Sequence, residues 1–272
     1  MPPHGQRGRA EMAKIVVVND DSPRSPGLLA LLEELRRAFP GEVLAFVPDR
    51  PRSGAGKSIT LGSRIELREQ DEGFYLVSGT PADAVLVALA SLGPEKPGVV
   101  VSGINMGPNL GLEDFLQSGT IGAAVQAALH RVPALAISYV IGEGFPLPPE
   151  EQVAEDLKLA AKLAVRLVEA VLAGGLPEDV DLLSVNVPAG AGLDRITITE
   201  LFREPFWKAV GRDGAFSLAP WPGMKPQGPE GTDVWAVLNG YISITPLSLD
   251  MRYEKEALRA FLEEHGLPPT LI

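Results

Sequence analysis

The sequence contains no cysteine, and histidine occurs only three times, at His4, His130 and His265. Without cysteine the chain has no disulfide bonds, no thiolate zinc site, no iron–sulfur cluster and no cysteine nucleophile. Three scattered histidines also exclude a histidine-rich metal cage. A metal ion bound by this protein would therefore be held mainly by oxygen atoms.

Basic residues are also scarce: 24 lysines and arginines stand against 35 aspartates and glutamates, which gives a net charge of −11. Proteins that bind nucleic acids usually carry a basic stripe, so we expect no nucleic acid polymer as a partner. No uncharged apolar run reaches the roughly 18 residues that a membrane span needs, and the first residues lack the apolar core of a secretory signal. We therefore expect a cytoplasmic protein with no membrane partner.

Predicted strands and helices alternate over the first two thirds of the chain. Apolar, β-branched runs, which are typical of strands buried on both faces, lie at 14–18, 43–47, 98–101, 134–138 and 182–187. Helices are predicted between them at 28–39, 81–92, 119–129 and 151–172, and a hairpin at 65–67 and 74–77. This alternation predicts an α/β fold with a mostly parallel sheet flanked by helices.

The alternation ends near residue 195. Strand-like segments at 195–201 and 241–247 enclose an aromatic, glycine- and proline-rich stretch, and a terminal helix is predicted at 254–264. We therefore divide the chain into an N-terminal extension (1–11), a core (12–195) and a β-rich C-terminal arm with its helix (196–272). Such an arm serves either for oligomerisation or as a lid.

Polar residues follow three of the predicted strands. Ligands of open parallel sheets bind beyond the carboxyl ends of the strands. The residues in these positions are Asn19, Asp20 and Asp21 after the first strand, Ser53 and Lys57 after the second, and Ser102, Asn105 and Asn109 after the strand that ends at 101. The sequence thus predicts one site at this edge of the sheet.

Asp20 and Asp21 are the most distinctive chemical feature of the sequence. In a turn that ends a strand, both carboxylates can face one pocket, and they raise each other's pKa unless a cation lies between them. With amide and hydroxyl oxygens nearby, the pair suits Mg²⁺ or Mn²⁺ better than zinc. The alternative is that either aspartate turns the chain or caps the next helix. Their position after the first buried strand favours a metal site.

Ser118, Gly119 and Thr120 stand at the start of the predicted helix at 119–129. Exposed backbone N–H groups and the helix dipole form a natural phosphate site there. The alternative, commoner for such a segment on its own, is an N-cap followed by a glycine for close packing. The chain has no GxGxxG motif after the first strand, and the loop at Lys57 lacks the spacing of a P-loop.

Five motifs occur in order along the chain: VVNDDSPRSPG, VPDRPRSGAGKSIT, VSGTPADAVLVAL, VVSGINMGPNLG and QSGTIGAA, followed by LLSVNVP and GYISITPLSLD. Together they resemble the SurE family of survival-protein nucleotidases, over about residues 13–251. The resemblance implies a Rossmann-like core and metal-dependent hydrolysis of nucleoside 5′- and 3′-monophosphates. It also implies a C-terminal arm exchanged between the subunits of a homodimer or homotetramer.

The resemblance assigns roles to the residues that match these motifs. It implies a divalent ion held by Asp20, Asp21, Ser53 and Asn105, and catalytic or pocket residues Asp20, Asn19, Asn109, Ser118, Gly119 and Thr120. Two positions depart from the family pattern, since Ser22 replaces a glycine and Lys57 replaces a histidine. A lysine there would be a permanent cation in place of a titratable one.

We therefore expect an enzyme that hydrolyses nucleoside monophosphates with Mg²⁺ or Mn²⁺. The ion would polarise a phosphoryl oxygen and activate a water, while Lys57 and the region of Thr120 would stabilise charge on the phosphoryl group. Two alternatives stay open: a nucleotide sensor that binds without cleaving, and a nucleotide-sugar transferase. The transferase would need a second, acceptor-binding domain, for which the C-terminal region is short.

Overall fold

The structure is a computed structural model that describes residues 13–142, 144–222, 225–252, 255–267 and 269–270. The predicted N-terminal extension at 1–11 lies outside the described residues. Among those residues, no helix is both long enough and apolar enough to cross a membrane.

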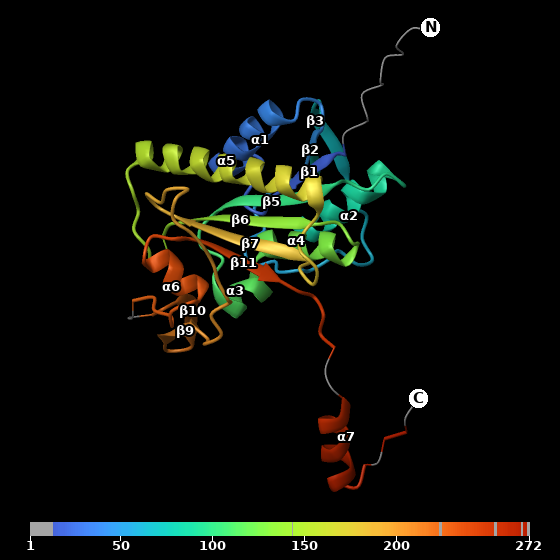
Figure 1. Cartoon of the computed structure of the whole chain (residues 1–272), viewed down its shortest axis with the longest axis vertical. Coiled ribbons are helices and arrows are strands. Elements are labelled where there is room, and N and C mark those ends of the chain that lie inside the picture. Colours follow the sequence, from blue (N-terminus) through green and yellow to red (C-terminus); the bar gives the residue numbers. More distant parts are fainter. Residues whose placement is uncertain (1–12, 143, 223–224, 253–254, 268, 271–272) are drawn as a thin grey trace, which may run out of the picture.

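The centre of the molecule is a nine-stranded sheet (Figure 1). Its strands are β1 (Ile15–Val18), β2 (Val43–Pro48), β3 (Leu67–Asp71), β4 (Phe74–Val77), β5 (Val99–Met106), β6 (Ala134–Val140), β7 (Leu182–Pro188), β8 (Ile196–Ile198) and β11 (Ile242–Leu247). They lie in the order β3-β4-β2-β1-β5-β6-β7-β11-β8. Only the β3–β4 and β7–β11 pairs are antiparallel, so the predicted, mostly parallel α/β sheet is confirmed.

Helices α1 (Pro26–Ala38) and α5 (Glu150–Gly174) cover one face of this sheet, and α2 (Pro81–Leu92) and α4 (Gly119–Leu129) cover the other. The further helices are α3 (Gly111–Gln117), α6 (Asp233–Leu238) and α7 (Lys255–Glu264). The buried side chains of α1 and α5 share one hydrophobic core, and those of α2 and α4 share a second core on the opposite face. Strand β1 contributes Ile15 and Val17 to the first core and Val16 and Val18 to the second, which explains its unbroken apolar sequence.

Strand β5 is longer than the sequence predicted. We expected it to end at Val101, but it continues to Met106 after a register shift in its pairing with β6 between Ser102 and Asn105. Gly103 makes this continuation possible, because its φ is 131° and a Cβ there would lie 2.2 Å from the carbonyl oxygen of Ile137. The polar, glycine-containing sequence is typical of a loop, so the extension could not be foreseen.

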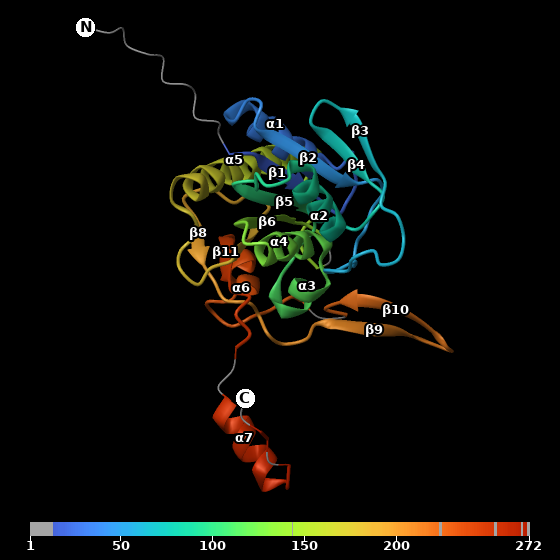
Figure 2. The same cartoon turned by 90° about the vertical axis from the view of Figure 1, so that its right-hand side faces the viewer.

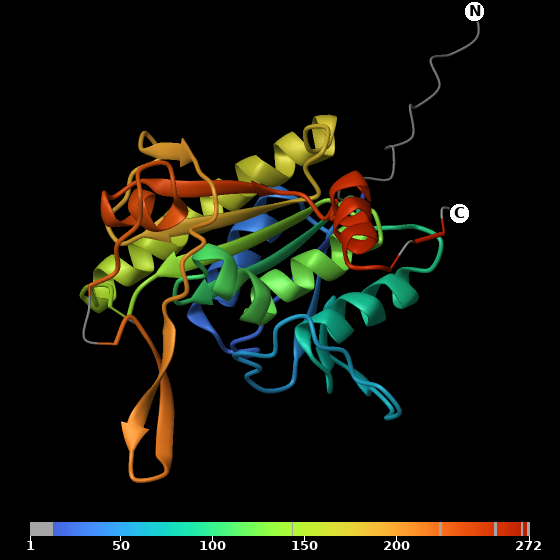
Figure 3. The same cartoon turned by 90° about the horizontal axis from the view of Figure 1, so that it is seen from below.

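The sheet also extends past the predicted boundary at residue 195. Strands β8 and β11 belong to the main sheet, because β11 pairs with β7 and β8 pairs with β11. Two parts of the predicted arm project from the body: the hairpin of β9 (Trp207–Arg212) and β10 (Ala215–Pro220), seen in Figures 2 and 3, and helix α7, seen in Figure 2. No residue of α7 is buried in the described part of the chain.

Candidate active site

A polar cavity of about 300 Å³ lies at the carboxyl ends of β1, β2 and β5. It is lined by Asp20, Asp21, Ser53, Gly54, Asn105, Met106, Gly107, Pro108, Asn109, Asp114, Gln117, Ser118, Trp207 and Leu218. Six residues singled out from the sequence are among them: Asp20, Asp21, Ser53, Asn105, Asn109 and Ser118. Segments far apart in the sequence therefore meet at one edge of the sheet, as the topology predicts.

Asp20 is held against the first turn of α4. The hydroxyl of Thr120 donates to Asp20 Oδ1 over 2.5 Å, and Thr120 is itself fully buried. A Cβ at position 119 would lie 2.8 Å from Asp20 Oδ2, so Gly119 permits this close approach. Gly119 and Thr120 therefore support Asp20 from behind and do not line the cavity.

The first turn of α4 is largely occupied by contacts within the protein. Ser118 caps it, since its Oγ accepts a hydrogen bond from the backbone N–H of Ile121 at 3.2 Å. The backbone N–H of Thr120 also hydrogen-bonds to Asp20. The positive end of this helix thus stabilises the Asp20 carboxylate, where the sequence suggested a seat for a phosphate.

Asp21 is anchored from β5 and from the start of α1. Its Oδ2 accepts hydrogen bonds from the backbone N–H of Met106 at 3.0 Å and from the hydroxyl of Ser25 at 3.3 Å. Asn105 precedes Met106, and its Nδ2 donates to the carbonyl of Gly107 over 2.9 Å. Oδ1 is the acceptor atom of this amide, so it is the atom that Asn105 can offer to a cation.

Both aspartates have perturbed acidities. Burial raises the pKa of Asp20 from 3.8 to about 6; the Thr120 hydroxyl opposes this shift and the charge of Asp21 adds to it. Burial also raises the pKa of Asp21, and the bonds from Met106 and Ser25 lower it in part. A nearby positive charge would stabilise the ionised form of both carboxylates and so lower both pKa values.

The loop that carries Ser53 is fixed to the same edge. The backbone N–H of Arg52 donates to the carbonyl of Asp20 over 2.7 Å, and that of Gly56 donates to Gln117 over 2.7 Å. Gly122 makes room for the loop, because a Cβ there would lie 2.3 Å from the carbonyl oxygen of Gly56. The Lys57 side chain is exposed and is not among the residues that line the cavity.

Asn109 lies in a buried polar network that the sequence did not reveal. Its Nδ2 donates to Ser138 Oγ over 2.8 Å. Its backbone N–H donates to Asn186 Oδ1 over 3.0 Å, and Asn186 Nδ2 returns a bond to the carbonyl of Asn109 over 2.9 Å. Asn186 lies within the LLSVNVP motif, so this motif was the feature of the sequence that could have pointed to Asn186.

Asn19 lies behind the cavity and does not line it. It is fully buried, and its Nδ2 donates to the carbonyl of Ser22 over 3.1 Å. Its Oδ1 and the Oγ of Ser102 are buried with no hydrogen-bond partner among the described residues. The turn after β1 is therefore closed by the backbone carbonyl of Ser22. Serine and glycine both supply this carbonyl, so the replacement of the family's glycine by Ser22 keeps the hydrogen bond.

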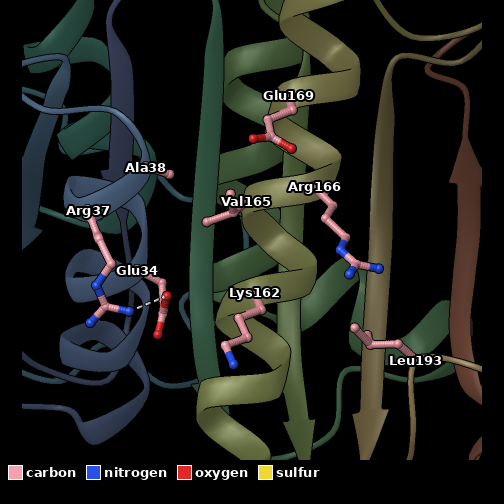
Figure 4. Close-up of a pocket in the computed structure, with 8 residues that line it drawn as sticks. All are labelled: Glu34, Arg37, Ala38, Lys162, Val165, Arg166, Glu169 and Leu193. Atoms are coloured by element: carbon pink, nitrogen blue, oxygen red, sulfur yellow. Dashed lines mark hydrogen bonds and ion pairs between the residues drawn. The ribbon is translucent and has the colours of Figure 1, made fainter.

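A second cavity, of about 320 Å³, lies between α1 and α5, and Figure 4 shows the residues that line it. Its charged side chains are of both signs, and Glu34 is already paired with Arg37 at 2.8 Å. Most of its lining comes from the two helices, and it contains none of the residues expected at the strand ends. The candidate site is therefore the cavity that contains Asp20 and Asp21.

Comparison with known proteins agrees with this architecture. A family model described as "Survival protein SurE" matches residues 15–207. The 5′-nucleotidase SurE of Methanothermobacter thermautotrophicus is 42% identical over 69% of this chain and 72% of its own length. The 5′-nucleotidase SurE of Methanocella arvoryzae is 38% identical over 88% of this chain and 92% of its own.

A solved structure has a similar fold over most of the chain. The crystal structure of the SurE protein from Aquifex aeolicus matches with a TM-score of 0.75 and 34% identity, over 93% of this chain and 99% of that one. Together with the family match, these similarities extend over the sheet, the cavity and most of the C-terminal region. The chain therefore belongs to the SurE family.

Proposed function

We propose that this protein is a metal-dependent 5′-nucleotidase that hydrolyses nucleoside monophosphates to a nucleoside and phosphate, with 3′-nucleotides as further substrates. One observation carries the proposal: Asp20, Asp21, Ser53 and Asn105 line the same cavity at the carboxyl edge of the sheet. Family membership supports the same activity, since relatives of the chain carry the name 5′-nucleotidase.

The donor set of the cavity fits a hard divalent ion. Asp20 and Asp21 offer two carboxylates together with hydroxyl and amide oxygens, and no group of three or more His, Cys, Asp or Glu residues in the described part of the chain is placed to hold a metal ion. Such oxygen ligands suit Mg²⁺ or Mn²⁺. Asp20, Asp21, Ser53 and Asn105 would hold the ion. When bound, it would supply Lewis-acid polarisation of a phosphoryl oxygen and a lowered pKa for a water.

The remaining residues would orient the phosphate and the aspartates. Ser118 Oγ already accepts the N–H of Ile121, which leaves its hydroxyl hydrogen free to donate to a phosphoryl oxygen. Asn109 lines the cavity in an orientation fixed by Ser138 and Asn186. Thr120, Gly119 and Asn19 act as positioning residues. Asp20 is also the candidate to accept a proton from the attacking water.

The fold argues against the transferase but does not separate the nucleotide sensor from the enzyme. The region after residue 195 adds strands to the main sheet, a hairpin and α7, and the described residues contain no second domain for a sugar acceptor. This speaks against a transferase. A nucleotide sensor would use the same cavity without cleaving the ester, so an assay must separate it from the enzyme.

The direct test is phosphate release from AMP with Mn²⁺ or Mg²⁺, with and without EDTA. We expect release that EDTA abolishes, and a loss of at least ~100-fold in turnover for Asp20→Asn, because a ligand of the metal is neutralised. Asp71→Asn, an exposed aspartate on β3, is the matched control and should keep full turnover. A sensor would bind AMP without releasing phosphate, and near-wild-type turnover of Asp20→Asn at saturating metal would remove the assignment.

We further propose that the chain forms a homodimer or homotetramer through its C-terminal arm. In α7 the apolar side chains of Leu258 and Phe261 are 57% and 55% exposed. An amphipathic helix with its apolar side uncovered requires a partner surface, and a second copy of the chain is the partner that the family resemblance implies.

A further inference from the structure

The cavity has an apolar part that hydrolysis at the aspartates does not use. Asp20, Asp21, Ser53 and Asn105 make up its acidic and polar part, whereas Met106, Pro108, Trp207 and Leu218 contribute apolar surface to the same lining. Trp207 and Leu218 come from the β9–β10 hairpin, more than 80 residues along the chain from the other lining residues, which end at Ser118. Figure 3 shows this hairpin leaving the body of the molecule beside the sheet.

The indole of Trp207 is held in a fixed orientation. Its Nε1 donates to Asp114 Oδ1 over 2.8 Å, and its backbone N–H donates to Glu113 Oε2 over 2.9 Å. Both acceptors belong to α3, so the start of β9 is fastened to a helix that borders the cavity.

The base of the hairpin is rigid as well. Phe206, which precedes Trp207, stacks on Trp221 with ring centroids 4.7 Å apart and an interplanar angle of 5°. These rings belong to a small buried cluster with Leu110 and Val234, on which Trp207 packs. An aromatic side chain that is ordered before the ligand arrives loses little conformational entropy on binding.

A nucleoside monophosphate has the same two-part character as this cavity. Its phosphate is anionic and its base is a flat aromatic ring, for which aromatic stacking is the sequence-tolerant mode of recognition. We propose that Trp207 is the specificity-determining residue that binds the base of the substrate, while the aspartate end receives the phosphate. This inference rests on the proposed nucleotidase activity and deepens it, because it makes nucleotides the preferred class over small phosphate esters.

The test compares AMP with glycerol 2-phosphate, a phosphate monoester without an aromatic ring. For Trp207→Ala we expect KM for AMP to rise roughly 10-fold or more, as befits the loss of one base–aromatic stack, with kcat little changed. KM for glycerol 2-phosphate should stay the same. Trp207→Phe keeps a ring and should recover most of the affinity for AMP. Adenosine should inhibit competitively, with a Ki that rises in Trp207→Ala by the same factor as KM for AMP.

Trp235→Ala is the matched control, because Trp235 is a partly exposed tryptophan that stacks on Tyr241 and does not line the cavity. It should leave both KM values unchanged. An unchanged KM for AMP in Trp207→Ala, or equal losses for both esters, would overturn the inference. If the wild type hydrolyses neither ester, the proposed nucleotidase activity is wrong, whatever the role of Trp207. Adenosine binding measured by equilibrium dialysis then still decides on Trp207, since weaker binding by Trp207→Ala supports its role and equal binding contradicts it.

Discussion

Asp20 connects the turn after β1 to the first turn of α4. Burial of its carboxylate destabilises the folded protein when no metal ion is bound. Only 5% of the residue is exposed, and its pKa is raised to about 6. A carboxyl group whose pKa is higher in the folded than in the unfolded state binds extra protons on folding. Its contribution to stability is therefore fully present below about pH 4 and is lost as the pH rises through about 6.

We therefore expect the free energy of unfolding of the metal-free protein to fall between pH 4 and pH 7 by about 2 kcal/mol more in the wild type than in Asp20→Asn. Urea unfolding of both proteins at the two pH values measures this difference. Saturating Mn²⁺ at pH 7 should restore stability to the wild type alone. Equal pH dependence in the two proteins would show that Asp20 does not have a raised pKa.

At the residue scale, the sequence predicted which side chains meet better than what each one does. Asp20, Asp21 and Asn105 could be predicted to converge because each follows or ends a strand of one parallel sheet. The roles of Thr120 and Lys57 could not, because the direction of a side chain in a loop or first turn depends on packing. Trp207 was missed because a distant hairpin brings it to the cavity.

At the scale of elements, Asp233 links three segments near the cavity. It is fully buried at the start of α6, and its carboxylate accepts backbone N–H bonds from Gly111 at 2.6 Å, Phe202 at 2.9 Å and Val234 at 2.8 Å. Gly111 begins α3, the helix that carries Asp114 into the cavity lining. Asp233 thus fixes the position of α3 relative to α6.

Asp233→Asn should lower the free energy of unfolding by about 1–3 kcal/mol, because the amide nitrogen would face a buried N–H that then has no acceptor. Chemical denaturation with the exposed Glu230→Gln as the control measures this loss. A stability within error of the wild type would mean that the three hydrogen bonds contribute nothing.

Elements with a clear apolar pattern could be predicted, including the four-residue strands β1 and β4, whereas several short elements without such a pattern could not. The predicted helix at 119–129 matches α4, because its small apolar residues and its serine cap act locally. Helices α3 and α6 were not predicted, since each has only one or two turns and depends on contacts with distant segments such as those of Asp233. β3 was predicted at 65–67 but lies at Leu67–Asp71, where all five residues are exposed and no apolar alternation marks the strand.

At the scale of the whole molecule, α7 lies apart from the sheet domain (Figure 1). Its exposed Leu258 and Phe261 would stay in water in an isolated chain. We expect light scattering to give a mass of two or four times 28.9 kDa at micromolar concentration. Leu258→Ser combined with Phe261→Ser should shift the protein towards smaller species, because the apolar contact is lost.

Arg259→Lys changes the polar side of the same helix and should leave the oligomer intact. A wild-type protein that is monomeric at this concentration would contradict the proposed role of the arm.

The central claim is that Asp20 and Asp21, with Ser53 and Asn105, bind a divalent cation, and titration calorimetry of the intact protein with Mn²⁺ and with Mg²⁺ tests it most directly. We predict saturable binding to the wild type and an affinity lower by at least ~10-fold in Asp21→Asn, which keeps the shape of the side chain and removes its charge. Binding of neither ion by the wild type, or equal affinity in Asp21→Asn, would contradict the claim.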